Sequence, residues 1–440
     1  MPAGQLILSY RGVQDDTLTK RKKSIFHGGY EKYSPFAKEI KVYEFNTVDW
    51  GTRSVCKIPK DLDMLSKLFL HIKVPSLNVP NNSINTNCVK LNELECFCDK
   101  CLKRSPNTFF SWVNSFCHVV VNEYTFNIGG NFRDTRLGEW LEIKSEFTQT
   151  SEKRFAYSEL TAKRDPTAMK KNGIKTDLNL MLPLELFFDK THSLAFPLCA
   201  TDDDIQLEVK WANFDKCWFS NTEGSKPNKV KLEASVIAEG YILNKEDREM
   251  SENRDHSYLI ELVQSSNNFF YPRGTKTPTL DLNFNLCVKE LYWFLQRSDV
   301  LERSSPGDSD VTFGNDHFNY SCFKSREKNI TIIDPIVSAK LLYSGSVNTD
   351  SLPAIFYRLA DPLFKHTKVP NNYIYNYTWS ASPESFNPMG TVNLSEIPNI
   401  RLSLEVAKEM YQNDYNVRAY ALSYNILFIY NRKVTLGYSI

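Results

Sequence analysis

Large apolar side chains alternate with polar ones along much of the chain. The pattern is clearest in residues 205–211, 280–286 and 402–406, and it is longest in residues 420–430, where an aromatic or aliphatic side chain occupies every second position. A period of two places one set of side chains on the core face of a strand and the other set on the opposite face. These segments are therefore predicted to be β-strands.

Shorter apolar runs between Pro, Asn and Ser residues predict further strands, at 70–74, 119–128, 180–188, 230–241, 291–295, 330–333 and 374–379. Helical periodicity is sparse. Leu137, Trp140, Leu141 and Phe147 share one helical face, and 405–410 is expected to form a short helical turn. Many short strands with few helices indicate an all-β fold of sandwiches or barrels.

The two halves of the chain carry similar patterns. In each half an aromatic strand, 184–188 or 373–379, passes through a Pro-containing loop into an alternating strand, 205–209 or 400–406. A charged stretch separates the halves and reads as a linker over 242–257. The repetition predicts two similar β domains in tandem.

Composition and charge narrow the function. A chain of 440 residues with 42% hydrophobic and 24% charged residues is typical of a folded globular protein, and its length allows two or three domains. The net charge of +1 argues against a global attraction to nucleic acid, so no specific nucleic-acid partner is expected. One basic run, Lys20, Arg21, Lys22 and Lys23, is either a solvated flank or an arm that contacts an acidic surface such as a membrane or nucleic acid.

No membrane span or secretion signal is expected. The longest clearly apolar stretch without charge, 419–431, has 13 residues, whereas a membrane helix needs about 20. The N-terminal sequence lacks a basic region followed by a long apolar segment, so it does not read as a signal peptide. Synthesis in the cytosol with reduced cysteines is the expectation.

Four cysteines form the most distinctive chemical cluster. Cys88, Cys96, Cys98 and Cys101 fall within fourteen residues. Four thiolates this close match the ligand number of a structural zinc site, and a disulfide that staples the loop is a second interpretation. Unrelated thiols are the third. The other six cysteines are scattered and are predicted to be packing residues.

Catalytic motifs are not found in the sequence, which has no nucleotide-binding glycine motif, no zinc-protease motif and no nucleophile elbow. No catalytic or cofactor-binding residue is therefore predicted. The triplet Asp202-Asp203-Asp204 has the composition of a cation site, but its place before a strand favours a solvated loop. His118, beside Cys117, is expected to lie in an apolar strand and to be a core residue with satisfied polar atoms rather than a metal ligand.

Short motifs in a fixed order resemble a known family, the major capsid proteins of large icosahedral double-stranded DNA viruses (the phycodnavirus, iridovirus and mimivirus group). They cover nearly the whole chain and are GVQD at 12–15, IFHGGYEKYSPFA at 25–37, NIGG at 127–130, LPLELFFDKTHSLAFPL at 182–198, HSYLIE at 256–261, GTVNLS at 390–395, YNV at 415–417 and YNIL at 424–427.

This resemblance implies a double jelly roll, two tandem eight-stranded antiparallel sandwiches. The expected limits are an N-terminal arm at 1–25, a first jelly roll at 26–241, the linker at 242–257 and a second jelly roll at 258–440. Long loops at 75–110, 150–178 and 297–328 would supply outer turrets and contacts between chains.

The resemblance also implies a structural, non-enzymatic role in the virion. Three chains would form a homotrimeric capsomer of pseudo-hexagonal outline that tiles an icosahedral shell. Its partners would be neighbouring capsomers, minor capsid proteins and the internal viral membrane. The arm with Lys20–Lys23 would face the interior of the capsid. Assembly would take place in the host cytoplasm.

Two other functions stay open. The chain departs from the family pattern at Met389, Leu394, Glu396 and Ile397. These departures keep a minor capsid or scaffold paralogue of the same family as an alternative. A carbohydrate-binding or hydrolytic β-sandwich is a more distant one, since no carboxylate pair can be placed from the sequence.

Overall fold

The computed structural model describes residues 33–77, 110–220, 226–301, 314–326, 329–344, 346–347 and 349–438. The chain divides into two units, Met1–Phe36 and Ala37–Ile440, and the description below concerns the second. The predicted arm at 1–25 lies outside the described residues. Among the described helices, none is long and apolar enough to cross a membrane.

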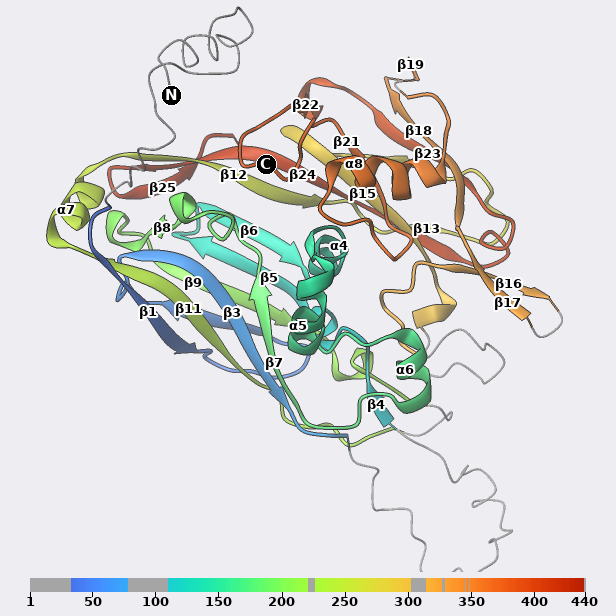
Figure 1. The fold of residues 1–440 in the computed structure, drawn as a ribbon, viewed down its shortest axis with the longest axis horizontal. Coiled ribbons are helices and arrows are strands. Elements are labelled where there is room, and N and C mark those ends of the chain that lie inside the picture. Colours follow the sequence, from blue (N-terminus) through green and yellow to red (C-terminus); the bar gives the residue numbers. More distant parts are fainter. Residues whose placement is uncertain are drawn as a thin grey trace, which may run out of the picture. The chain divides into compact units, whose positions relative to one another are not determined.

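The first half is a sandwich of two antiparallel sheets (Figure 1). One sheet has the order β1-β11-β3-β7, with β8 paired to β3, and the other has the order β2-β9-β5-β6. The strands are β1 (Phe36–Glu44), β2 (Arg53–Ile58), β3 (Met64–Val74), β5 (Val121–Ile128), β6 (Phe132–Leu137), β7 (Leu178–Leu184), β8 (Phe196–Pro197), β9 (Ile205–Trp211) and β11 (Glu233–Leu243), with a separate pair of β4 (Phe110–Trp112) and β10 (Trp218–Ser220).

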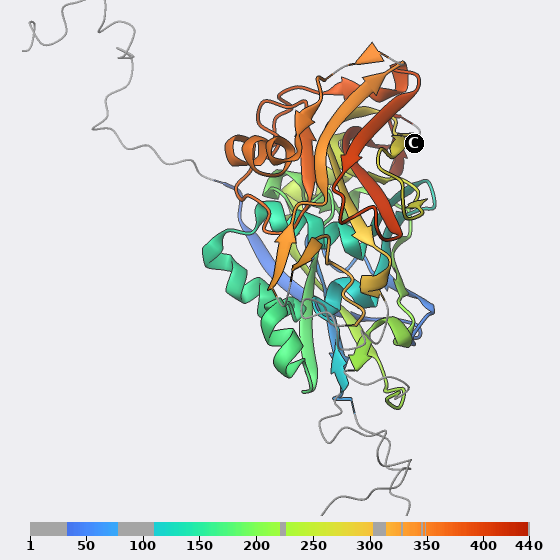
Figure 2. The same cartoon turned by 90° about the vertical axis from the view of Figure 1, so that its right-hand side faces the viewer.

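The second half repeats this arrangement beside the first (Figure 1, Figure 2). Its sheets have the orders β12-β24-β15-β21 and β14-β23-β18-β19. Their strands are β12 (His256–Ser265), β14 (Thr279–Asp281), β15 (Cys287–Arg297), β18 (Ile336–Tyr343), β19 (Ser346–Val347), β21 (Tyr375–Thr378), β23 (Ile400–Val406) and β24 (Tyr415–Tyr430). Short strands flank them: β13 (Phe269–Tyr271), β16 (Cys322–Arg326), β17 (Asn329–Ile333), β20 (Leu352–Pro353), β22 (Val392–Asn393) and β25 (Lys433–Leu436).

Both halves have the same topology. When the eight strands on the main paths of each half are numbered in chain order, the two sheets read 1-8-3-6 and 2-7-4-5 in both halves. Two sheets wrapped together in this order form a jelly roll. The predicted fold class, two tandem eight-stranded jelly rolls, is confirmed.

Most of the predicted strands are present. Residues 205–211 are β9, and 402–406 and 420–430 lie within β23 and β24. The segment 280–286 pairs only over β14, although Leu282, Phe284 and Leu286 are buried as the alternation predicted. The helical turn expected at 405–410 begins later than predicted, because β23 continues to Val406. In the turn that follows, the backbone N–H of Tyr411 donates to the Ala407 carbonyl at 3.2 Å.

Helices occupy connections between the strands. They are α3 (Phe116–Val120), α4 (Gly138–Thr148), α5 (Ser151–Thr161), α6 (Pro166–Asn172), α7 (Lys245–Asn253) and α8 (Asp361–Lys365). The start of the predicted strand 119–128 is therefore the end of α3, and the predicted loop at 150–178 holds α5 and α6. Helix α7 lies within the predicted linker and is capped by Asn244, whose Oδ1 accepts from the backbone N–H of Asp247. The domain limits themselves stay a prediction.

Each jelly roll has its own apolar core, and one strand serves more than one core. β24 is 16 residues long. Val417, Ala419 and Ala421 point into the core of the second jelly roll, whereas Leu427 and Ile429, near the other end of the strand, pack in the core of the first. The two jelly rolls therefore share a continuous element of sheet.

Candidate functional site: the junction between the two jelly rolls

Helix α4 of the first half covers the outer face of the second half's sheet. Trp140, Ile143 and Phe147 recur at spacings of three and four, which places them on one helical stripe. They pack in a third core cluster against aromatic and aliphatic side chains of β15, β24 and the segment before β21, namely Tyr292, Phe294, Tyr420, Leu422 and Ile374. The ring centroids of Trp140 and Tyr292 are 5.4 Å apart in an edge-to-face contact.

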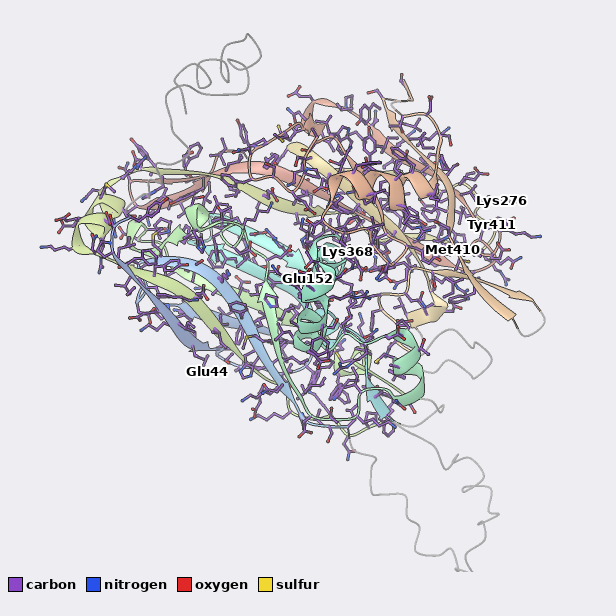
Figure 3. The ribbon with its side chains drawn as sticks, in the orientation of Figure 1. Glu44, Glu152, Lys276, Lys368, Met410 and Tyr411 are labelled. Carbon is purple, nitrogen blue, oxygen red and sulfur yellow. The ribbon has the colours of Figure 1, made fainter. Side chains whose placement is uncertain are left out.

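The polar side of α4 is buried as well. Glu142 Oε2 lies 2.6 Å from His118 Nδ1, and Lys163 Nζ lies 2.6 Å from both Glu142 Oε1 and Glu146 Oε1. Glu146 also pairs with Lys368 of the second half at 3.2 Å. Lys368, labelled in Figure 3, lies beside the end of α4, where its backbone N–H donates to the Phe147 carbonyl. Burial would raise the pKa of Glu142, but Lys163 and His118 outweigh it and hold that pKa below its usual value.

His118 is a satisfied core residue, as predicted. Its side chain is buried, and Nε2 lies 2.9 Å from the hydroxyl of Tyr157 on α5 while Nδ1 faces Glu142. Its expected place in a strand is wrong, because it belongs to α3.

A second charged cluster surrounds His366. Nε2 lies 3.0 Å from Glu290 Oε1, and Nδ1 lies 3.2 Å from Glu384 Oε1. The ring packs edge-on against Phe147 of α4 at 4.9 Å. Burial alone would lower the pKa of His366, but the two carboxylates outweigh it and raise that pKa to about 9. The imidazole is therefore a cation at neutral pH.

A cavity of about 370 Å³ lies between α4, the loop after β7 and the strands β12 and β24. Lys289 beside it is fully buried and pairs with Glu261, which also pairs with Lys190. Burial lowers the pKa of Lys289 to about 8. The cavity lining includes Arg136, Lys144 and Lys190 as well as Glu185, Asp189, Glu261 and Glu384. Both signs of charge are present, so these groups neutralise one another and favour neither an anion nor a cation as ligand.

The aspartate triplet joins the C-terminal hairpin to the first jelly roll. Asp203 is buried and accepts from the backbone N–H of Val434 at 2.8 Å and from Lys433 Nζ at 2.9 Å. Asp202 pairs with Arg432 at 2.8 Å. The prediction of a solvated loop is wrong for Asp203, because its carboxylate is needed to satisfy groups of the β24–β25 hairpin.

None of the predicted site residues falls within the described ranges. Cys88, Cys96, Cys98 and Cys101 lie outside the described residues, as do Lys20, Arg21, Lys22 and Lys23. Within the described ranges, no group of His, Cys, Asp and Glu side chains is placed to hold a metal ion. Of the six cysteines predicted to be packing residues, five are buried and Cys287 is exposed.

The polar half of the junction was missed by the sequence reasoning. A signal existed, because Glu139, Glu142 and Glu146 recur at spacings of three and four, as the apolar stripe does. A second stripe of this kind is usually a solvated helix face. Here Glu139 instead pairs with Arg418 at 2.9 Å and accepts from the Tyr420 hydroxyl at 2.6 Å, both on β24.

In the comparison with known proteins, each half of the chain matches a family model of major capsid proteins. Residues 24–239 match the family model described as the major capsid protein N-terminus. Residues 246–433 match the family model described as the large eukaryotic DNA virus major capsid protein. Together the two matches span nearly all of the described residues.

Individual relatives are distant but match over their full length. The major capsid protein of Phaeocystis pouchetii virus is 22% identical, with 100% of both chains covered. Probable capsid protein 4 of Acanthamoeba polyphaga mimivirus is 20% identical, with 97% of both covered. A chain of the PBCV-1 virus capsid has the same fold, with a TM-score of 0.74 at 19% identity over 95% of this chain and 100% of that one.

Proposed function

The chain belongs to the major capsid protein family of large eukaryotic DNA viruses, and from this premise we propose that three copies form a capsomer of pseudo-hexagonal outline that tiles an icosahedral shell. The protein is a structural component of the virion capsid and not an enzyme. Its role is to fold, to contact other subunits and to occupy a fixed position in the shell.

The repeated topology is the observation that supports the trimer. Because both halves have the same strand order, three chains bring together six similar jelly rolls. Six similar units can surround an axis with near-sixfold contacts, although the true symmetry is threefold. The net charge of +1 also fits an assembly of many copies, which strong like charge would push apart.

The further partners follow from the same premise. Neighbouring capsomers would contact the sides of the trimer. Minor capsid proteins and the internal viral membrane would meet its inner face, where the arm at 1–25 with Lys20–Lys23 offers positive charge to acidic groups. Assembly would take place in the host cytoplasm.

Native mass tests the trimer. Light scattering on the purified chain should give about 152 kDa, three times 50.8 kDa. A stable monomer at micromolar concentration would refute the proposal. Deleting residues 1–23 should leave the chain trimeric while impairing shell assembly, whereas loss of the trimer would contradict an inner-face role for the arm. Copy number in purified virions separates a major shell protein from a minor paralogue.

For the cysteine cluster at 88–101 we propose a bound structural zinc ion or a disulfide bond. One zinc per chain in metal analysis, or protection of two or four thiols from alkylation without reductant, would support it. Metal-free protein in which Cys88, Cys96, Cys98 and Cys101 all react would refute it.

A further inference from the structure

The cavity at the junction is lined by buried polar groups that the described fold leaves without partners. Its volume is about 370 Å³, and Trp140, Lys144 and Tyr424 contribute to its lining. All three side chains belong to residues that are at least nine-tenths buried. Buried polar groups in proteins are nearly always hydrogen-bonded, so groups of this kind indicate where a further molecule binds.

The three unpartnered groups are all hydrogen-bond donors. Trp140 Nε1 and the Tyr424 hydroxyl have no hydrogen-bond partner among the described residues. Lys144 Nζ forms no hydrogen bond or ion pair there either, and it interacts with nearby carboxylates only through space. Lys144 and Trp140 are four positions apart on α4 and therefore share one helical face. Glu261 and Glu290 are charged neighbours of both Lys144 and Tyr424, which places the three donors in the same part of the cavity.

An unpaired carboxyl group lies in another part of the lining. Asp189, in the loop after β7, is partly buried and forms no ion pair within the described part of the chain. The cations near it, Arg136 and Lys190, pair instead with Asp134 and Glu261. Burial raises the pKa of Asp189 to about 7. A cation brought to this carboxyl group would favour its ionised form, and would itself be attracted.

The rest of the lining is largely apolar, and the cavity has the size of a small molecule. Leu186, Phe187, Leu194, Leu259 and Leu422 supply hydrocarbon surface. A cavity of about 150 Å³ holds one benzene molecule, so the volume here has room for roughly 15 non-hydrogen atoms. The lining therefore matches a ligand that has a charged group at each end and a short hydrocarbon part between them.

We propose that this cavity binds a small zwitterion of the amino-acid class, with its carboxylate at Lys144, Trp140 and Tyr424 and its ammonium group at Asp189. A zwitterion adds no net charge to a lining in which both signs are already present. Asp189 belongs to the first jelly roll and Tyr424 to the second, so the bound molecule would connect the two halves. The site goes beyond the proposed trimer and does not depend on it.

Calorimetric titration of the purified chain with 6-aminohexanoate tests the site. This probe carries an ammonium and a carboxylate group at the two ends of an unbranched hydrocarbon chain, whereas hexanoate and hexylamine each keep only one of these charges. The zwitterion should bind with one molecule per chain, and each single-charge analogue should bind at least about tenfold more weakly. Equal binding of hexanoate or hexylamine would overturn the assignment to a zwitterion. No saturable binding of 6-aminohexanoate up to about 10 mM would overturn the site itself.

Three variants separate binding from folding. Y424F removes a hydroxyl that has no partner in the described chain, so without ligand it should melt like wild type, yet it should bind 6-aminohexanoate about tenfold more weakly. K144Q should weaken binding by at least as much. D189N should weaken the binding of 6-aminohexanoate but not that of hexanoate. Y430F and K153Q are the matched controls, because both residues are exposed and neither lines the cavity. Wild-type affinity for 6-aminohexanoate in any of the three site variants would overturn the proposal.

Discussion

His366 should stabilise the junction between the jelly rolls in a way that depends on pH. Its imidazolium lies between Glu290, which is fully buried, and Glu384, with Phe147 of α4 against the ring. Lys144 and Lys289 are the other cations near Glu290. H366Q keeps the approximate size of the side chain and removes the positive charge. It leaves a buried carboxylate with one cationic neighbour fewer, which is expected to cost about 3–5 kcal/mol of unfolding free energy.

The pH dependence follows from the raised pKa. The pKa of His366 is about 9 in the folded protein, whereas the ordinary value, taken for the unfolded chain, is 6.5. Folding therefore takes up a proton at pH values between 6.5 and about 9. The stabilisation, about 3 kcal/mol, is complete below pH 6.5 and is lost as the pH rises through 9. In melting curves this corresponds to roughly 6–12 °C for a domain of this size. Lys289, whose pKa is lowered to about 8, acts in the opposite direction, but it is present in both proteins.

Calorimetric melting of wild type and H366Q from pH 6 to pH 10 tests this reasoning. The difference in melting temperature should be largest at pH 6 and should shrink by pH 10. E290Q/H366Q should recover much of the loss, because it removes the stranded charge together with its partner. H192Q, at an exposed position, serves as control and should shift melting by less than a degree or two. A constant difference between wild type and H366Q across this range would show that the residue acts through packing alone.

Two further variants probe other contacts between the halves. W140A removes the indole that α4 packs against β15 and should lower the unfolding free energy by about 3–5 kcal/mol in denaturant unfolding. The control F155A, at an exposed position on α5, should lower it by less than about 0.5 kcal/mol. Equal effects of the two variants would contradict the proposed role of α4. D203A leaves the N–H of Val434 without its acceptor, so it should lower the unfolding free energy by about 1–3 kcal/mol and speed proteolysis of the C-terminal hairpin. The control D204A, at an exposed position, should change neither the unfolding free energy nor the proteolysis rate.

Local pattern was enough to predict the strands whose surroundings follow from their own residues. The segment 205–211 alternates without interruption and is β9. The pattern failed where distant contacts decide the structure. Val119-Val120 reads as a strand, yet it ends α3, whose five residues are all buried by neighbouring elements. Helix α5 has a polar sequence and was expected to be a loop, but Tyr157 on it contacts the buried His118.

The charged part of the junction could not be predicted for a related reason. Glu146 in isolation reads as a solvated helix residue. Its partner Lys368 is 222 positions away in sequence, and no local period links the two. The motif resemblance identified the family and the double jelly roll, but it concerns short segments and carries no information on which charges meet across the fold.

The shared strand β24 resists separation of the two jelly rolls. β24 contributes side chains to all three apolar clusters, so the second jelly roll cannot separate from the first without exposing Leu427 and Ile429 of that strand. β12 beside it contributes Ile260 and Leu262 to the first core in the same way. A hinge between the halves would therefore have to break sheet packing as well as the ion pairs of α4. Each chain should therefore enter assembly with its two jelly rolls already fixed at one angle, which is what the proposed ring of three chains requires.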